Sequence, residues 1–189
     1  MERKKIISEV CLSDPLYLDR GDSSDDTPYR ISLAGVRAIK TGKTHYADPV
    51  GTALLRQAIS QALSKELGIE YDPQQEILVT AGASPAIFVT LMALTLPDND
   101  ILVPKPYWPT YLQMISSLNR RMIFYPMPFV FGEVSPDDWY NTLRSKITSS
   151  TRLIIINSPH NPTGTRLDAV WFDLYPISWT HRKSAIIIT

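Results

Sequence analysis

The feature that most constrains this chain is an apolar run that stops at a polar loop. Leu153 to Ile156 is continuously apolar, which is typical of a strand buried on both faces of a sheet. The loop behind it reads N-S-P-H-N-P-T-G-T, from Asn157 to Thr165. Because ligands in open α/β sheets sit outside the carboxyl ends of the strands, we expect this loop to carry chemistry, with Asn161 as the leading candidate. Asn-Pro followed by glycine is also typical of an ordinary turn, so both interpretations stand on local grounds.

Apolar patterning predicts strands and helices in alternation. The expected strands are Ile77 to Thr80, Ile101 to Val103, Met122 to Tyr125, Leu153 to Ile156 and Ala185 to Ile188. The expected helices are Ile31 to Lys40, Val50 to Leu67, Pro85 to Leu96, Thr110 to Leu118 and one from a Ser135 cap to Ile147. This order predicts an α/β fold with a mostly parallel sheet and helices on both faces.

Composition narrows the class of protein. The 189 residues are 44% hydrophobic and 20% charged, as in ordinary globular proteins. Lysine plus arginine equals aspartate plus glutamate at 19 each, so bulk charge indicates neither nucleic acid nor an anionic membrane as partner. No apolar run approaches the roughly 20 residues of a membrane span. A single cysteine, Cys11, fits a reducing compartment, so we expect a cytoplasmic protein, and we predict no metal site.

Two further loops follow expected strands. Gly82, Ala83 and Ser84 lead into a helix, with Ser84 as the expected cap, and free N–H groups at a helix start can hold a phosphate. The same pattern is a common strand-to-helix connection. Trp108 lies among three prolines, where it could pack into the core or offer its face to a planar ligand. Thr41 to Thr44 reads T-G-K-T, but Arg37 stands where a P-loop requires glycine, so we do not expect a P-loop.

Four motifs, in this order, resemble those of the class I/II aminotransferases, which are pyridoxal-phosphate enzymes of fold type I. They are His45-Tyr46 with Gly51 ahead of a Leu-Arg helix, Thr80 to Ser84, Pro106-Tyr107-Trp108, and Asn157 to Gly164. Each motif alone is weak, and the combination is specific. The resemblance implies pyridoxal 5'-phosphate as cofactor and an amino acid and a 2-oxo acid as substrates.

The resemblance also assigns roles to residues. The cofactor-binding residues that it implies are Tyr46, Gly82, Ala83, Ser84, Trp108 and Asn161. The three residues of the turn would hold the phosphate, Trp108 would stack on the pyridine ring, and Asn161 would donate its amide to the phenolic oxygen. Tyr46 would reach the phosphate of a neighbouring subunit, which implies a homodimer.

The family's catalytic residues follow the strand that matches Ala185 to Thr189. They are the aspartate that pairs with the ring nitrogen and the lysine that forms the Schiff base, and both would lie beyond Thr189. We therefore expect no catalytic residue in this chain, and we interpret it as the amino-terminal part of an aminotransferase. Two later strands of the family's sheet are also missing, so Ile77 to Thr80 would lack neighbours and Ala185 to Ile188 would form an open edge.

The domain division and the alternatives complete the prediction. Residues 1–45 are expected to form an arm and part of the small domain, and residues 46–189 an incomplete large domain that binds the cofactor. Ser13 stands where the family usually has glycine, and Pro176 interrupts an expected helix. The leading function is amino transfer. The alternatives are another fold type I reaction (carbon–sulfur lyase, decarboxylase or cyclopropane-forming synthase), or an inactive chain that acts only in binding or dimerisation.

Overall fold

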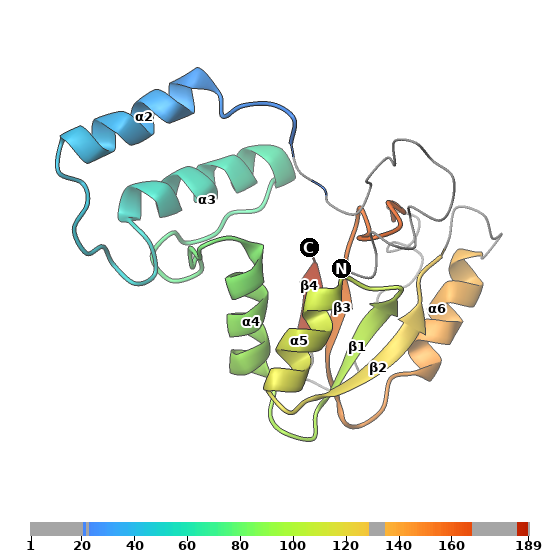
Figure 1. The fold of residues 1–189 in the computed structure, drawn as a ribbon. Coiled ribbons are helices and arrows are strands. Elements are labelled where there is room, and N and C mark those ends of the chain that lie inside the picture. The colour runs from blue at the N-terminus through green and yellow to red at the C-terminus, as the bar shows by residue number, and fades with distance from the viewer. Residues whose placement is uncertain (1–20, 22, 129–134, 168–184, 189) are drawn as a thin grey trace, which may run out of the picture. The chain divides into compact units, whose positions relative to one another are not determined.

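The computed structural model describes residues 21, 23–128, 135–167 and the backbone of 185–188 (Figure 1). The chain divides into two compact units, Met1–Asp48 and Pro49–Thr189. The prediction placed a domain boundary after residue 45, and the assignment of the two parts to a small and a large domain stays a prediction. The expectations for Ser13 and Pro176 concern residues outside the described ranges.

The first unit contains the helix α2 (Tyr29–Lys40), which has no buried residue. It ends where the Thr41 hydroxyl donates to the Arg37 carbonyl at 2.9 Å. Gly42 follows with a φ of 74°. The T-G-K-T stretch therefore lies just past the carboxyl end of a helix, whereas a phosphate-binding loop lies at a helix start. This placement agrees with the expectation that it is not a P-loop.

The second unit is built on a parallel sheet. Its elements are α3 (Ala53–Leu67), α4 (Ala83–Leu94), β1 (Asp100–Lys105), α5 (Pro109–Ser117), β2 (Arg121–Pro126), α6 (Pro136–Ser145), β3 (Thr151–Ile156) and β4 (Ala185–Ile188). The strand order is β2-β1-β3-β4, and every pairing is parallel. The predicted parallel α/β sheet is confirmed. Within the described ranges β4 pairs only with β3, so it lies at the edge of the sheet as expected.

Helices cover both faces of this sheet (Figure 1). Alternate side chains of β1 point to opposite faces, as the two-residue period of a strand requires. Ile101 and Val103 pack with Ile87 of α4 and with α5, while Leu102 packs with Leu143 of α6. The result is three layers, with α4 and α5 on one face of the sheet and α6 on the other.

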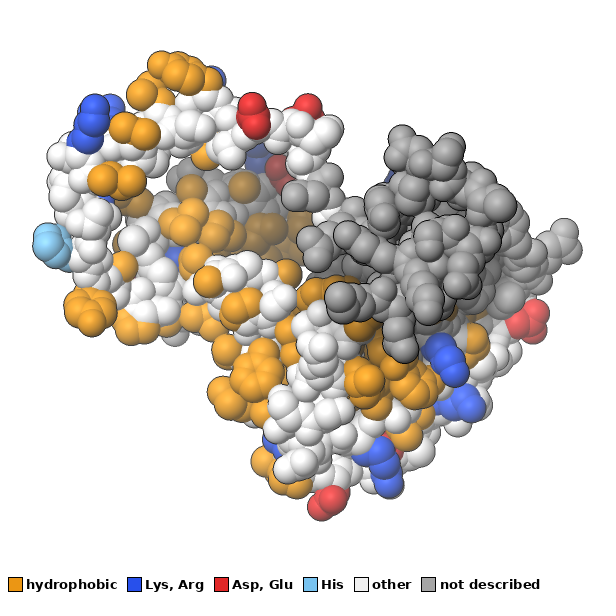
Figure 2. Space-filling view, in the orientation of Figure 1, with side chains coloured by type: hydrophobic (Ala, Val, Ile, Leu, Met, Phe, Trp, Pro, Cys, Tyr) orange, Lys and Arg blue, Asp and Glu red, His pale blue; other side chains and the backbone are white. Residues whose placement is uncertain are grey.

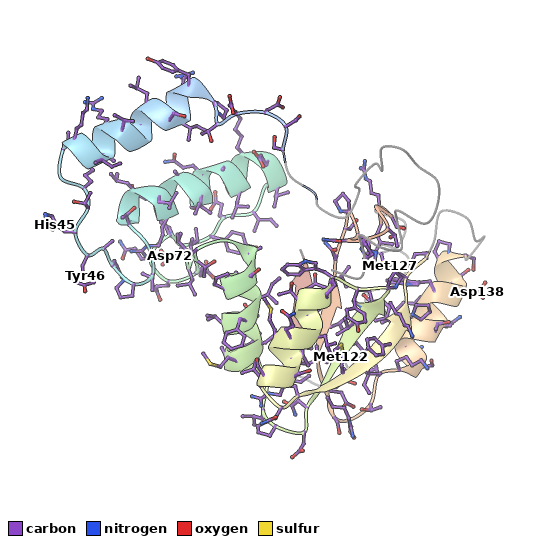
Figure 3. The ribbon with its side chains drawn as sticks, in the orientation of Figure 1. His45, Tyr46, Asp72, Met122, Met127 and Asp138 are labelled. Atoms are coloured by element: carbon purple, nitrogen blue, oxygen red, sulfur yellow. The ribbon has the colours of Figure 1, made fainter. Side chains whose placement is uncertain are left out.

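The helix α6 begins as the sequence predicts. Ser135 is its N-cap, and the Ser135 hydroxyl oxygen accepts a hydrogen bond from the backbone N–H of Asp138 at 3.1 Å. Asp138 lies in the first turn (Figure 3), where a carboxylate interacts favourably with the positive end of the helix dipole. The cap therefore fixes where this helix starts.

The prediction of a strand at Ile77 to Thr80 is wrong. This segment is not a strand, and the described sheet has four strands rather than five. Among the described residues, its backbone is joined to a distant segment by the hydrogen bond from the Val79 N–H to the Val50 carbonyl, at 3.0 Å. A strand needs a hydrogen-bonded neighbour to satisfy its ladder, and none of the described strands pairs with this segment.

Large apolar side chains stay exposed on α2 and α3, and Figure 2 shows such side chains on the visible face. On α2 they include Ile31 and Ile39, and on α3 Leu54 is 75% exposed and Leu67 is 61% exposed. Both helices have the apolar periodicity that predicted them. On α3, however, only part of the apolar stripe is covered, since Ile59 and Leu63 are partly buried.

Candidate functional site

The first part of the candidate site is the turn that leads into α4. The Gly82 N–H donates to the Thr80 carbonyl at 2.8 Å, and the Thr80 hydroxyl donates to the Gly82 carbonyl, also at 2.8 Å. Gly82 has a φ of 94° and a ψ of 179°, a conformation that is open essentially to glycine alone. Gly82 is the N-cap of α4, so the expectation that Ser84 is the cap was wrong. The sharp turn at Gly82 starts the helix two residues earlier.

This turn leaves backbone donors free at the positive end of a helix. The N–H groups of Ala83 and Ser84 have no acceptor among the residues that the structure describes, and no side chain caps the helix. Apart from its two neighbours in the chain, none of the described residues has an atom within 4 Å of the position that a Cβ on Gly82 would take. Free N–H groups, open space and a helix dipole together suit a phosphate. The Gly82 N–H itself is already bonded, so the available donors are those of Ala83 and Ser84.

The second part is the loop between β1 and α5. Trp108 is the N-cap of α5, and its carbonyl accepts from the Tyr111 N–H at 3.0 Å. The Trp108 ring is partly buried against the cluster that α4, α5 and the sheet form, and it meets Tyr111 edge to face with centroids 5.4 Å apart. Tyr107 stacks on Phe124 at 5.3 Å. These contacts hold both rings of the loop in place.

The third part is the loop after β3, which is closed by its own hydrogen bonds. The Asn161 N–H donates to Oδ1 of Asn157 at 2.6 Å. The His160 N–H donates to the Thr165 carbonyl at 2.8 Å, and the Gly164 N–H donates to the His160 carbonyl at 2.6 Å. Asn157 is buried, whereas Asn161 is exposed. The loop is therefore fixed by its backbone, and the exposed Asn161 amide makes no hydrogen bond with the rest of the described chain.

His160 belongs to the loop after β3, and its ring lies near the backbone of Pro106 in the loop after β1. Its side chain is 2% exposed, and Nδ1 lies 2.7 Å from the Thr163 hydroxyl. Nε2 is buried without a hydrogen-bond partner among the described residues. Burial lowers the pKa of the His160 imidazole below its ordinary value, and the nearby backbone of Pro106 partly opposes this shift. Sequence reasoning gave His160 no specific role, although the residue stands inside the motif from Asn157 to Gly164.

These three parts begin at the same end of the sheet, the one that the carboxyl ends of its strands form, which we call the sheet edge. β1 and β3 are adjacent and parallel, so the loops that follow them leave the same edge. α4 and α5 lie side by side in one core cluster, and both start at that edge (Figure 1). A hollow of about 550 Å³ also opens beside the Trp108 loop, lined by Lys105, Pro106, Tyr107, Pro109 and Leu112. None of the predicted cofactor-binding residues lines that hollow.

Tyr46 belongs to the first unit. Its side chain is fully exposed and projects from the connection after α2 (Figure 3). Its assigned role towards a neighbouring subunit stays a prediction.

Other kinds of site find little support in the described ranges. No group of three or more His, Cys, Asp or Glu side chains there is arranged to hold a metal ion. None of the helices described is both long and apolar enough to cross a membrane.

Comparison with known proteins identifies the family. The model of the aminotransferase class I and II family matches residues 13–170, so the chain belongs to this family. It is 38% identical over 152 residues to a probable aspartate/prephenate aminotransferase of Aquifex aeolicus, covering 80% of this chain and 37% of that protein. It is 35% identical over 153 residues to a probable N-succinyldiaminopimelate aminotransferase of Mycobacterium tuberculosis, covering 80% and 38%.

Solved aminotransferase structures are also similar to this chain. The N-succinyldiaminopimelate aminotransferase of Mycobacterium tuberculosis matches with a TM-score of 0.74 at 34% identity, over 81% of this chain and 39% of that one. The aromatic aminotransferase of Pyrococcus horikoshii matches with a TM-score of 0.81 at 29% identity, over 99% and 48%. The chain therefore has part of the α/β fold of the fold type I aminotransferases. It spans less than two fifths of the length of the two relatives named above.

Proposed function

We propose that this chain supplies the phosphate-binding and ring-binding loops of a pyridoxal-phosphate-dependent aminotransferase, which moves an amino group between an amino acid and a 2-oxo acid. The observation that carries this proposal is the start of α4, where the N–H groups of Ala83 and Ser84 are free at the sheet edge from which the Trp108 and Asn161 loops also leave. The aminotransferase names of the relatives support amino transfer over the other fold type I reactions.

The residues of the chain fit the cofactor in three ways. Ala83 and Ser84 would donate backbone N–H groups to the phosphate, while Gly82 gives the turn its shape. Trp108 would lie against the pyridine ring and exclude water from one face, because Tyr111 and the core hold its ring. The exposed amide of Asn161 would donate to the phenolic oxygen. When bound, the cofactor supplies the electron sink for the reaction, and the protein supplies its orientation.

The rest of the proposed site comes from other segments. The aspartate for the ring nitrogen and the lysine for the aldehyde are expected beyond Thr189, in the part of the relatives' length that this chain does not match. Tyr46 is proposed to reach the phosphate of a second subunit in a homodimer. The exposed apolar side chains of α2 and α3 support such pairing, because isolated soluble chains rarely leave so many exposed.

The test is binding of pyridoxine 5'-phosphate, which carries the phosphate but has no aldehyde to react with surface lysines. We expect the chain to bind it more tightly than pyridoxine. Ala83→Pro removes one donor at the first helical position, where proline is well tolerated, and should weaken phosphate binding by about tenfold. Ala53→Pro makes the same change at the first position of α3 and should leave binding unchanged. Equal affinity of the wild-type chain for the two compounds would contradict the proposal.

A further inference from the structure

The segment that leads into the phosphate-binding turn pairs with none of the described strands, so other residues must fix its path. Its tie to a distant part of the backbone is the hydrogen bond from the Val79 N–H to the Val50 carbonyl, at 3.0 Å. The next residue, Gly51, has a φ of 101° and lies directly against Val79. A Cβ on Gly51 would come within 2.6 Å of both Cβ and Cγ2 of Val79, which no real side chain tolerates. The Val50–Gly51 turn is therefore fitted closely to Val79.

Arg56 holds this turn from α3. Its side chain is only 7% exposed, and it is the one buried residue of α3. Nε donates to the Gly51 carbonyl at 3.0 Å, and Nη1 donates to the carbonyls of Pro73 and Gln74 at 2.7 and 3.2 Å. A buried guanidinium is costly unless it is hydrogen-bonded, and these backbone acceptors offset part of that cost. One side chain thus joins the segment before α3 to the segment after it.

The second of these segments is itself rigid. Oδ1 of Asp72 accepts from the Gln74 N–H at 2.7 Å, and Oε2 of Glu76 accepts from the Asp72 N–H at 2.8 Å. Asp72 lies in the connection between α3 and α4 (Figure 3). Residues 72–76 therefore form a braced turn, and its carbonyls at 73 and 74 are the ones that Arg56 holds. The chain then runs through Val79 to the bonded pair Thr80 and Gly82, and on to the free N–H groups.

We propose that Arg56 is a positioning residue for the phosphate-binding turn: by holding Gly51 and the 73–74 carbonyls it fixes Val79, and through Val79 it sets the direction of the Ala83 and Ser84 N–H groups. This inference rests on the proposed function, because it assumes that those groups bind a phosphate. It goes further by assigning the site's geometry to a residue that does not touch the ligand. A small misplacement of donors weakens binding steeply, so the effect should be measurable.

The test separates positioning from general stability. Arg56→Met removes all the donors, and Arg56→Lys keeps the charge and one point of attachment. Leu143→Ala is the matched control, since Leu143 is buried on the opposite face of the sheet, and Ile154→Val on that same face is a milder control if the loss is too large. For each variant of the full chain, two quantities are compared below its unfolding temperature: the amide NMR shifts of Ala83 and Ser84 without ligand, and the ratio of the dissociation constants of pyridoxine and pyridoxine 5'-phosphate.

We expect Arg56→Met to shift both amide signals and to reduce the preference for the phosphate compound by about tenfold, with Arg56→Lys recovering part of it. The controls should lower the unfolding temperature and leave both quantities unchanged. If the wild-type chain shows the preference and Arg56→Met keeps it, the positioning role is overturned while the proposed function stands. The positioning role is also overturned, and the proposed function also stands, if the controls reduce the preference for the phosphate compound as much as Arg56→Met does. If the wild-type chain shows no preference, the proposed function itself fails and this inference fails with it.

Discussion

The backbone N–H of Asn161 donates to the side-chain oxygen of Asn157 at 2.6 Å, so the buried asparagine fixes the exposed one. The two asparagines of this loop therefore have different roles. Asn157 holds the backbone, and its neighbour four residues on is left with a free amide at the sheet edge.

Replacing each asparagine by alanine should separate the structural role of Asn157 from the binding role of Asn161. Asn157→Ala removes a buried acceptor and leaves the Asn161 N–H without it, so the free energy of unfolding should fall by about 1–3 kcal/mol. Asn161→Ala changes an exposed side chain and should alter that free energy by less than about 0.5 kcal/mol, while weakening pyridoxine 5'-phosphate binding. Urea unfolding and calorimetric titration measure the two effects. Equal destabilisation by both changes would contradict this division.

Trp108 and Trp139 offer a matched pair on opposite faces of the sheet. Trp108→Leu should weaken pyridoxine and pyridoxine 5'-phosphate alike and by several-fold, because an aromatic pair contributes about 0.5–1.5 kcal/mol beyond area burial. Trp139→Phe removes the bond from Nε1 to the Pro126 carbonyl, at 3.0 Å, and should cost stability without changing affinity. A Trp108 effect confined to the phosphate compound would refute ring stacking.

His160 should make stability depend on pH near neutrality. Burial lowers the pKa of the folded His160 imidazole below 6.5, so the unfolded chain binds more protons around that pH. Stability is therefore full above the unfolded value and falls as the pH drops below it. His160→Gln should flatten the change in urea midpoint between about pH 7.5 and pH 5.5. An unchanged slope in the variant would show that other groups titrate there.

Asp100 should make the stability of the fold depend on pH in a more acidic range. The hydrogen bond from the Arg121 guanidinium holds the pKa of the Asp100 carboxyl below 3.8, and the Thr148 hydroxyl, 3.0 Å from Oδ2, adds to this. The stabilisation is present above the unfolded value and is lost as the pH falls through the folded one. Asp100→Asn should lower stability at neutral pH and reduce the acid sensitivity below about pH 4. Acid titration followed by circular dichroism tests this, and identical acid midpoints would contradict it.

Local patterning predicted most of the second unit. The alternation of apolar runs and loop formers was enough for β1 to β4, α5 and α6, because each has its partners within the described chain. The same reasoning failed at Ile77 to Thr80, since a strand depends on neighbours that a local pattern does not reveal. It also predicted the apolar stripe of α3, yet Leu54 is exposed and Arg56 is buried.

The sheet is confirmed, whereas the cofactor-binding residues stay predictions. The family motifs pointed to Gly82, Ala83, Ser84, Trp108 and Asn161, and the structure puts their loops at one sheet edge. It also changes the start of α4, where the φ of Gly82 places the cap ahead of Ser84. The supporting contacts of Arg56 and His160 could not be predicted, because their acceptors are backbone or side-chain atoms that only the folded loops bring near.

The most direct test of the account is an amide NMR titration of the chain with pyridoxine 5'-phosphate. It should move the backbone signals of Ala83 and Ser84, the indole N–H of Trp108 and the side-chain amide of Asn161 along one binding curve, with a single dissociation constant. Movement of the Ala83 and Ser84 signals alone, or of none of the four, would contradict the claim that these loops share one ligand.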